Sequence, residues 1–249
     1  MRTILQICRR ELKYFFVSPR GYLVMTAFLF LQGWIFVLIV SALSNRQQPA
    51  PVGSIMQVFL GQNIFFWIFL LLVLPITTMG LVAEERRSGT IELLLTAPVT
   101  EGQVILGKFL GAYLFYVILW VPTFLYPALL ARATTIDPWP LVSGYLYLFA
   151  VGAPFVALGV LASALSRNQI TAAILTSTLI FLVFALPVFL QSKVQSDAMR
   201  SSLVYINLWD PAGDFGRGIV DTRLLVYTMT AAVLLLIAAA RTLELKKAR

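Results

Sequence analysis

Histidine is absent from the 249-residue sequence, and cysteine occurs only once, at Cys8. A disulfide within the chain needs two thiols, and Cys/His metal sites need several such ligands, so the sequence excludes both. The lack of histidine also removes the side chain that most often acts as general acid, general base or activator of a nucleophile. Most ordinary enzyme mechanisms are therefore excluded, and we expect no catalytic residue and no metal site.

Charged residues are also scarce. They make up 12% of the chain, hydrophobic residues make up 59%, and the mean hydropathy is +0.87. Soluble domains carry roughly 25% charged residues, and a soluble core could not bury this much apolar surface. The net charge of +8 could indicate nucleic acid, but the basic residues fall between apolar runs, so we expect no nucleic-acid partner. We predict an all-α integral membrane protein with one transmembrane domain over residues 1–249.

Six charge-poor runs reach the ~20 residues that a helix needs to cross a ~30 Å hydrocarbon core. They are Gly21–Leu43, Val58–Ala83, Val104–Ala131, Leu141–Leu165, Ile170–Leu190 and Leu224–Ala240, with Lys108 just inside the start of the third. The first run is longer than the apolar core of a signal peptide and no cleavage pattern follows it, so we expect it to be retained. We therefore predict six transmembrane helices.

Local signals agree with the starts of three runs. Ser18 and Asp137 each precede a proline at the first helical position, and Thr100 with Gln103 forms a capping-box pattern before the third run. Prolines within the runs predict kinks, which neighbouring helices allow in a membrane. These prolines are Pro75, Pro122, Pro127, Pro154 and Pro187.

The distribution of basic residues predicts the orientation in the lipid bilayer. Thirteen of the nineteen Lys and Arg residues fall on the side of the two termini, and six fall on the other side. Loops on the cytoplasmic side carry the excess of Lys and Arg. Both termini are therefore expected to be cytoplasmic.

Residues 1–20 form a separate element with an amphipathic pattern. Ile4, Cys8, Leu12 and Phe15 recur at steps of three or four residues, as along one face of a helix. We predict an interfacial helix, which either anchors the chain to anionic lipid or offers a docking surface to a cytoplasmic partner.

The external segment 191–223 is too polar to span the membrane and too apolar for a solvated linker. We expect short helices on the outer membrane surface, where Tyr205 and Trp209 suit the headgroup level.

The cytoplasmic segment 84–100 is the most informative part of the sequence. Its charged start, residues 84–87, stops the second span, and Ser88 with Gly89 breaks the helix. We predict that Thr90–Leu95, which is rich in Ile and Leu, forms a short apolar helix that ends at Pro98. Such a helix costs free energy in water, so its apolar face either lies on the inner leaflet or is buried in a partner. The residues alone leave both alternatives open.

The stretch EERRSGTIELLLTAPV, which begins at Glu84, resembles the coupling-helix signature of type 2 ATP-binding-cassette (ABC) permeases. The stretches ELKYFFVSPRGY and GDFGRGIVDTRLLVY resemble the gliding-motility and copper-processing branch of that family. With six spans in the expected order, the resemblance covers essentially the whole chain. It implies a permease in the bacterial inner membrane that pairs with a second copy or a related permease, and that contacts a separate cytoplasmic ATPase carrying ATP and Mg.

The resemblance also implies roles for individual residues. Residues that would couple to the ATPase are Glu84, Glu85, Thr90, Ile91, Glu92, Leu93, Leu94, Leu95 and Pro98. Residues of the interfacial helix that would rest against the same subunit are Arg9, Arg10, Leu12, Lys13 and Phe16. Residues of the external motif, which could contact an extracytoplasmic partner, are Phe215, Arg217, Gly218, Asp221 and Arg223.

Gly102–Lys108 reads GQVILGK and partly matches a phosphate-binding loop, but Phe109 replaces the magnesium-binding hydroxyl and no strand precedes it. Its glycines fit helix packing better. Small residues spaced by four, which let helices approach closely, are Gly107 with Gly111, Ala153 with Ala157 and Gly159 with Ser163.

The interiors of the six runs lack Asp, Glu, Lys and Arg, which disfavours ion-coupled transport. An apolar path suits a lipid-linked, amphipathic or peptide cargo, and it equally suits a permease that moves an external partner mechanically. A scaffold or channel without an energy source is the main alternative from another class.

Overall fold

The computed structural model describes residues 2–44, 59–60, 64–89, 99–132, 137–191, 193 and 206–247. Helices make up nearly all of this part of the chain, and it contains no strand. The helices are α1 (Arg2–Val17), α2 (Pro19–Ser44), α4 (Ile64–Thr78), α5 (Ala83–Arg87), α7 (Glu101–Trp120), the 3-10 helix η1 (Val121–Phe124), α8 (Leu125–Leu130), α9 (Pro138–Leu165), α10 (Gln169–Gln191), α12 (Trp209–Gly216) and α13 (Thr222–Lys247).

Six stretches of helix among the described residues are long and apolar enough to cross a membrane. They are Pro19–Ser41, Ile64–Arg87, Glu101–Leu130, Pro138–Leu165, Gln169–Gln191 and Thr222–Leu245. Each coincides with one of the six predicted runs. The predicted all-α membrane fold is therefore confirmed.

The predicted helix starts are confirmed by hydrogen bonds. The Thr100 hydroxyl accepts from the Gln103 backbone N–H at 3.3 Å, and the Gln103 side chain accepts from the Thr100 N–H at 3.4 Å, which completes the capping box. The Asp137 carboxylate caps α9, and the Ser18 hydroxyl accepts from the Gly21 N–H at the start of α2. At Pro122, α7 gives way to η1, whereas α4, α9 and α10 continue past their interior prolines.

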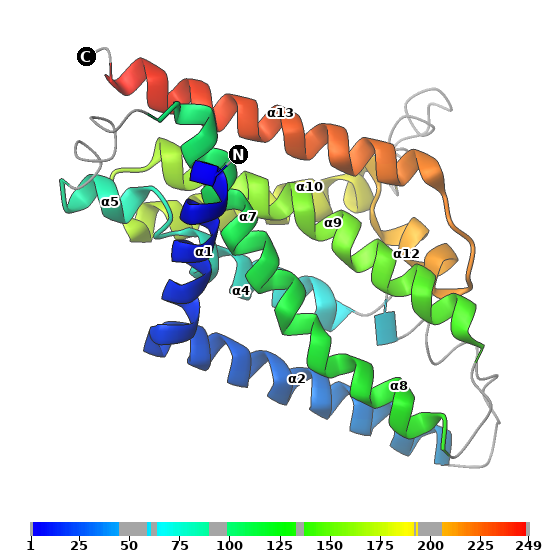
Figure 1. Cartoon of the computed structure of the whole chain (residues 1–249). Coiled ribbons are helices and arrows are strands. Elements are labelled where there is room, and N and C mark those ends of the chain that lie inside the picture. The colour runs from blue at the N-terminus through cyan, green and yellow to red at the C-terminus, as the bar shows by residue number, and fades with distance from the viewer. Residues whose placement is uncertain are drawn as a thin grey trace.

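Helix α9 forms the centre of the bundle. It packs against α13, α10, α7, α12 and α4, and more of its surface is buried than that of any other spanning helix among the described residues (Figure 1). Few residues of helices α2, α10 and α13 are buried, and many of their apolar side chains are exposed. In a membrane the exposed faces of these three helices contact lipid or another subunit, because exposing so much apolar surface to water is unfavourable.

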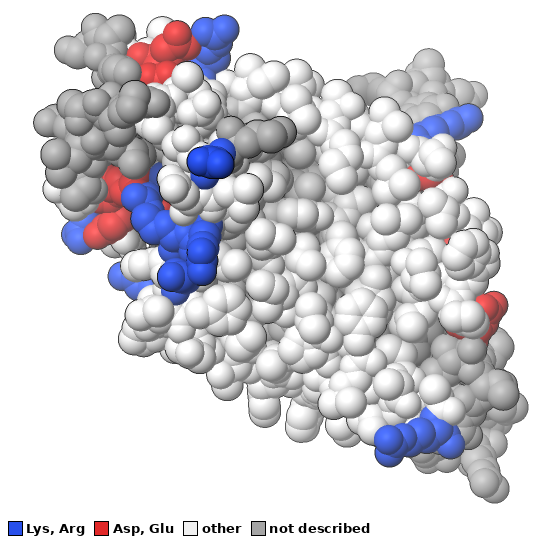
Figure 2. All heavy atoms as spheres, viewed as in Figure 1, with Lys and Arg blue, Asp and Glu red and all other residues white. Residues whose placement is uncertain are grey.

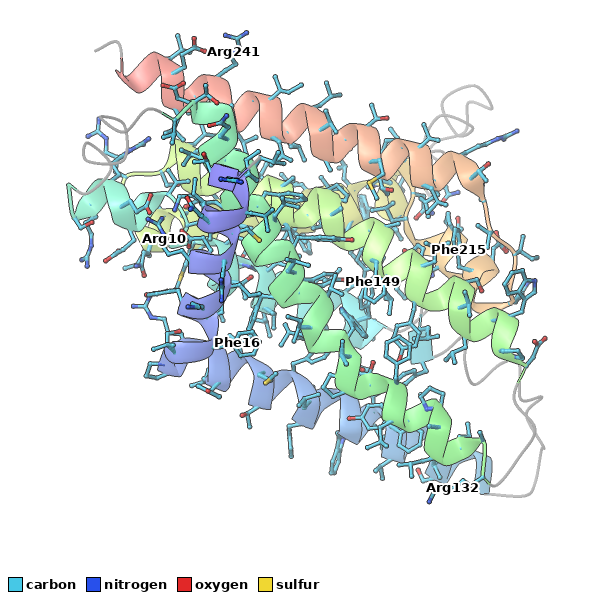
Figure 3. The ribbon with its side chains drawn as sticks, in the orientation of Figure 1. Arg10, Phe16, Arg132, Phe149, Phe215 and Arg241 are labelled. Atoms are coloured by element: carbon cyan, nitrogen blue, oxygen red, sulfur yellow. The ribbon has the colours of Figure 1, made fainter. Side chains whose placement is uncertain are left out.

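The bundle has two chemically different ends. Lys and Arg side chains gather at the end that contains α1, α5, the turn between α9 and α10, and the last turns of α13 (Figure 2). We call this the basic end. Arg10 and Arg241 lie there, whereas Arg132 and Phe215 lie toward the opposite end (Figure 3).

Two glycines allow α9 to touch its neighbours closely. A Cβ atom on Gly152 would lie 2.1 Å from the ring of Tyr116, and one on Gly159 would lie 2.2 Å from the hydroxyl of Thr78. Both partners are completely buried, so neither can move away. The predicted packing role of Gly159 is confirmed, with α4 as the partner helix.

We predict that Gly159→Ala destabilises the bundle by about 1–3 kcal/mol, because its methyl group overlaps Thr78 in a packed interior. Thermal unfolding of the purified protein in detergent measures the change. Gly102→Ala is the matched control, since a Cβ there meets nothing within 4 Å. Equal melting temperatures for the two variants would contradict the close packing of α9 on α4.

Candidate functional site: a charged junction at the basic end

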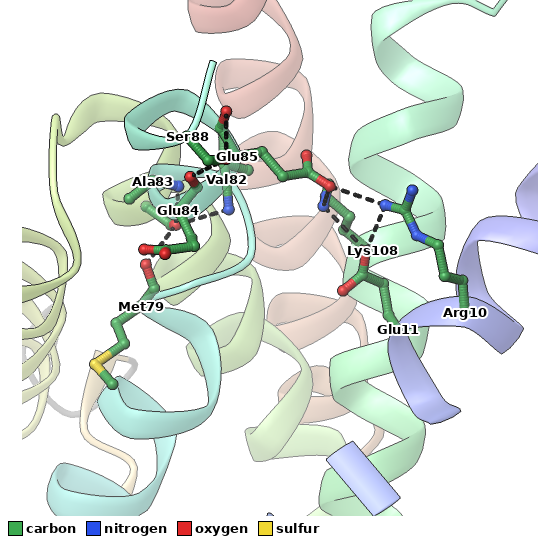
Figure 4. Close-up of polar contacts among 10 residues, drawn as sticks. Arg10, Glu11, Met79, Val82, Ala83, Glu84, Glu85, Ser88 and Lys108 are labelled. Carbon is green, nitrogen blue, oxygen red and sulfur yellow. Dashed lines mark hydrogen bonds and ion pairs between the residues drawn. The ribbon is translucent and has the colours of Figure 1, made fainter. Parts of the chain in front are cut away.

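Helix α5 is a short charged segment that the chain enters through a tight turn after α4. The hydroxyl of Ser163 on α9 accepts from the backbone N–H groups of Val82 and Ala83 at 3.0 Å each, and it donates to the carbonyl of Met79 at 3.0 Å (Figure 4). A single buried side chain therefore satisfies three backbone groups of this turn. It fixes the direction in which α5 leaves the bundle.

An ion cluster ties α5 to α1 and α7. Lys108 Nζ lies 2.8 Å from Glu85 Oε1 and 3.1 Å from Glu11 Oε1, and Arg10 lies 2.8 Å from Glu85 and 2.9 Å from Glu11 (Figure 4). Two cations thus face two carboxylates. We call Arg10, Glu11, Glu85 and Lys108 the junction cluster.

Burial makes the junction cluster a constraint on the fold. The side chain of Lys108 is 1% exposed and that of Glu11 is 11% exposed, whereas Arg10 reaches solvent. A buried charge that lacks a partner costs several kcal/mol, so Lys108 holds both carboxylates beside it. Desolvation alone lowers the pKa of Arg10, but the hydrogen bonds and charges of Glu11 and Glu85 outweigh it and raise the pKa above its ordinary value. Arg10 therefore stays charged at the outer edge of the cluster.

Helix α1 packs closely on α7 because α7 has glycines at the points of contact. A Cβ on Gly107 would lie 2.8 Å from Ile7, and one on Gly111 would lie 2.6 Å from the Cβ of Glu11. One turn further along, Phe15 stacks on Phe115 with ring centroids 4.4 Å apart. The predicted small-residue pair of α7 is therefore confirmed as a packing site, and its partner is α1.

The amphipathic character predicted for α1 is confirmed. Its apolar face, with Cys8 and Phe15, packs on α7 of the same chain. Leu12 and Phe16 are half-buried there, and Arg9 and Lys13 are exposed. The side of α1 that remains for other molecules carries these basic residues together with the exposed Leu5 and Tyr14.

Helix α5 is also attached to the start of α10. The carboxylate of Glu84 accepts a short hydrogen bond from the Gln169 side chain and pairs with Arg87 at 3.1 Å. The Arg86 guanidinium donates to the backbone carbonyl of Ser166 at 3.1 Å. The structure thus engages Glu84 and Glu85 within the chain, although the resemblance assigned both to an ATPase.

The other predicted coupling residues, Thr90, Ile91, Glu92, Leu93, Leu94, Leu95 and Pro98, lie outside the described residues. The helix break expected before them is confirmed, because α5 ends at Arg87 with Ser88 as its C-cap, and Gly89 adopts a φ of +71°. A positive φ is a conformation that glycine adopts without steric cost. The segment therefore leaves from a defined point on α5 and returns at the capped start of α7.

The external motif has structural roles at the opposite end. Phe215 on α12 is completely buried, and its backbone carbonyl accepts from the Ser143 hydroxyl of α9 at 2.6 Å. Gly218 turns the chain with a φ of +90°, and Asp221 caps α13 by accepting from the Arg223 N–H at 2.8 Å. Arg217 and Arg223 are exposed. A short helix thus forms in segment 191–223, with one face buried on α9; Tyr205 lies outside the described residues.

The sequence analysis placed Lys108 just inside the start of the third span and did not identify its partners. The spacing of Glu11, Glu85 and Lys108 along the chain carries no signal of contact, because the three residues lie on different helices. The one available hint was a lysine within an apolar run, which requires a nearby carboxylate.

Comparison with known proteins identifies one family. A family model described as "ABC-2 family transporter protein" matches residues 37–240, which is most of the chain. No curated protein matches the sequence.

We predict that Lys108→Met lowers the free energy of unfolding by about 3–5 kcal/mol, because it removes the buried cation between Glu11 and Glu85 and leaves only the exposed Arg10 to pair with them. Thermal unfolding in detergent measures the loss. Lys13→Met is the control, since Lys13 is exposed on α1, the helix that packs against Lys108. Adding Glu85→Gln to Lys108→Met is expected to restore part of the stability. Identical melting of the Lys108 and Lys13 variants would show that the cluster does not hold the junction.

We predict that Cys8 reacts slowly with N-ethylmaleimide in the folded protein. Burial against α7, and next the negative charge of Glu11, raises the pKa of the Cys8 thiol, so the reactive thiolate fraction is small at pH 7.5 and grows only at higher pH. Mass spectrometry follows the labelling, and the same protein unfolded in detergent is the control for full reaction. Rapid labelling of the folded chain at pH 7.5 would mean that α1 does not stay on α7.

Proposed function

The chain belongs to the ABC-2 family of transporter proteins, and from that premise we propose that this permease subunit receives force from a separate ATPase through residues 90–98. The observation that carries the proposal is the anchoring of both ends of that segment. Its start follows α5, which the junction cluster and Ser163 hold, and its end is the capping box of α7.

A push on residues 90–98 would reach several spanning helices at once. Ser163 connects the α4–α5 turn to α9, Gln169 and the Ser166 carbonyl connect α5 to the start of α10, and Lys108 connects it to α7. Rigid elements that share short polar contacts move together when one of them is displaced. The bundle therefore has a defined entry point for mechanical work.

The chemistry of ATP hydrolysis belongs to the partner in this proposal. ATP and Mg would bind to the ATPase subunit, and this chain would supply no catalytic residue. Nucleotide binding would draw two ATPase subunits together and displace the segments seated in them. A second copy of this chain or a related permease would complete the assembly through the exposed faces of α2, α10 or α13.

The charge distribution supports the orientation. Lys and Arg gather at the basic end, where α5 and residues 90–98 are attached (Figure 2). By the bias of basic residues toward the cytoplasm, this end would face the cytoplasm of a bacterial inner membrane, together with the ATPase. The exposed basic face of α1, with Arg9 and Lys13, lies at the same end and would rest against that subunit.

The nature of the work depends on the other end of the bundle. Transport of a lipid-linked, amphipathic or peptide cargo fits the apolar spans, and mechanical action on an external partner, as in the gliding-motility and copper-processing branch, fits the exposed arginines beside α12. Both uses start from the same coupling step.

We predict that Glu92→Ala combined with Leu94→Asp abolishes co-purification of the ATPase subunit while membrane insertion stays normal. The tagged permease is purified from membranes, and the retained ATPase is quantified. Glu244→Ala with Leu245→Asp is the matched control, because it makes the same changes on the exposed end of α13 at the basic end. Undiminished co-purification with the Glu92/Leu94 variant would contradict the proposed contact between residues 90–98 and the ATPase, and would favour a scaffold or channel.

A further inference from the structure

A cavity of about 320 Å³ lies beside the junction cluster, between α1, α2, α4 and α5. Its size is within the roughly 300–1,000 Å³ of small-molecule sites. Polar side chains line one part of it, including Arg20, Glu84 and Gln169, and apolar side chains such as Val24, Ile76 and Phe115 line the rest. A molecule that fills this cavity needs a polar part and an apolar part.

All but one of the charged residues that line the cavity form ion pairs with described residues. Lys108 and Arg10 are paired with Glu11 and Glu85, and Glu84 is paired with Arg87. Arg20 donates to the neutral Gln169 side chain at 3.3 Å, and it is the one charged lining residue without an ion pair to another described residue. Three cations and three carboxylates line the cavity, so its lining is neutral overall. The guanidinium of Arg20 is nevertheless not held in an ion pair with another described residue, so it can bind a single anionic group.

The position of Arg20 relates the cavity to the membrane surface. Arg20 is the second residue of α2, so it lies where the first spanning helix enters the bilayer. Exposed apolar residues, Tyr22 and Leu23, follow it at once. A guanidinium at this depth meets phosphate groups of lipids, and basic pockets between spanning helices bind such headgroups.

The apolar wall of the cavity also opens toward the membrane. Ile76 on α4 lines the cavity and is still 40% exposed, and Val24 lines it one turn beyond Arg20 on α2. Outside the bundle at this level the solvent is the acyl region of the bilayer rather than water. An acyl chain can therefore enter between α2 and α4 while its headgroup stays at Arg20.

We propose that this cavity binds one phospholipid of the leaflet at the basic end, with its phosphate on Arg20 and part of an acyl chain along Val24 and Ile76. The lipid would fill the space between the α1–α2 corner and the α4–α5 turn. Lipid binding at this site does not depend on the presence of an ATPase.

Native mass spectrometry of the delipidated, purified chain tests the site. Phosphatidylglycerol and phosphatidylethanolamine are each expected to add one tightly held molecule, because both carry the phosphate and acyl chains. Diacylglycerol, which lacks phosphate, and glycerol 1-phosphate, which lacks acyl chains, are expected not to bind. Retention of glycerol 1-phosphate alone would replace the lipid proposal by a soluble phosphate site and overturn it.

Substitutions locate the bound lipid. Arg20→Gln is expected to weaken binding about tenfold, which is a typical loss for a charge-assisted hydrogen bond, and Arg20→Lys is expected to keep most of it. Arg167→Gln is the matched control, since Arg167 is an exposed arginine at the basic end that does not line the cavity.

A second pair of variants tests the apolar part. Ile76→Trp is expected to fill the cavity and prevent binding, whereas Ile68→Trp changes a similarly exposed residue of α4 outside it and is expected to bind normally. If Ile76→Trp does not fold, Arg20→Gln, an exposed substitution, decides alone. Equal lipid retention by the variants and their controls would show that lipid merely surrounds the bundle, and would overturn the proposal.

Discussion

The burial of Lys108 is the constraint on which the arrangement of the basic end depends. An ammonium group that is 1% exposed within an apolar helix requires carboxylates within contact distance, and the structure supplies them from α1 and α5. Without Glu11 and Glu85, α7 could not carry this lysine in the bundle. Without Lys108, only the exposed Arg10 would remain to pair with the two carboxylates. The position of three helices thus follows from one charge.

The junction cluster acts together with two neutral devices. Ser163 satisfies the backbone of the α4–α5 turn, and Gly107 with Gly111 brings α1 into contact with α7. Each contact is short and directional, so α5 has little freedom relative to α4, α7, α9 and α10. An element connected in this way transmits displacement instead of absorbing it, which is what the proposed coupling requires.

The two ends of the bundle differ in their charges and in their contacts. The basic end concentrates ion pairs and a mixed polar and apolar cavity, whereas the opposite end buries Phe215 on α9 and exposes Arg217 and Arg223. The spans between them are almost free of charge, so the bundle separates the region of the proposed coupling from the exposed arginines at the opposite end. The proposed lipid would fill the space beside the first of these regions.

Hydropathy, capping patterns and prolines were sufficient to predict six spans, their starts and the amphipathic α1, because these properties depend on residues close together in sequence. Contacts between distant residues were not predictable from that information. The pairing of Glu11, Glu85 and Lys108, the seat of α1 on α7 and the burial of Phe215 each join segments far apart in sequence. Only the tertiary structure decided them, since a buried charge specifies that a partner must exist but not which residue provides it.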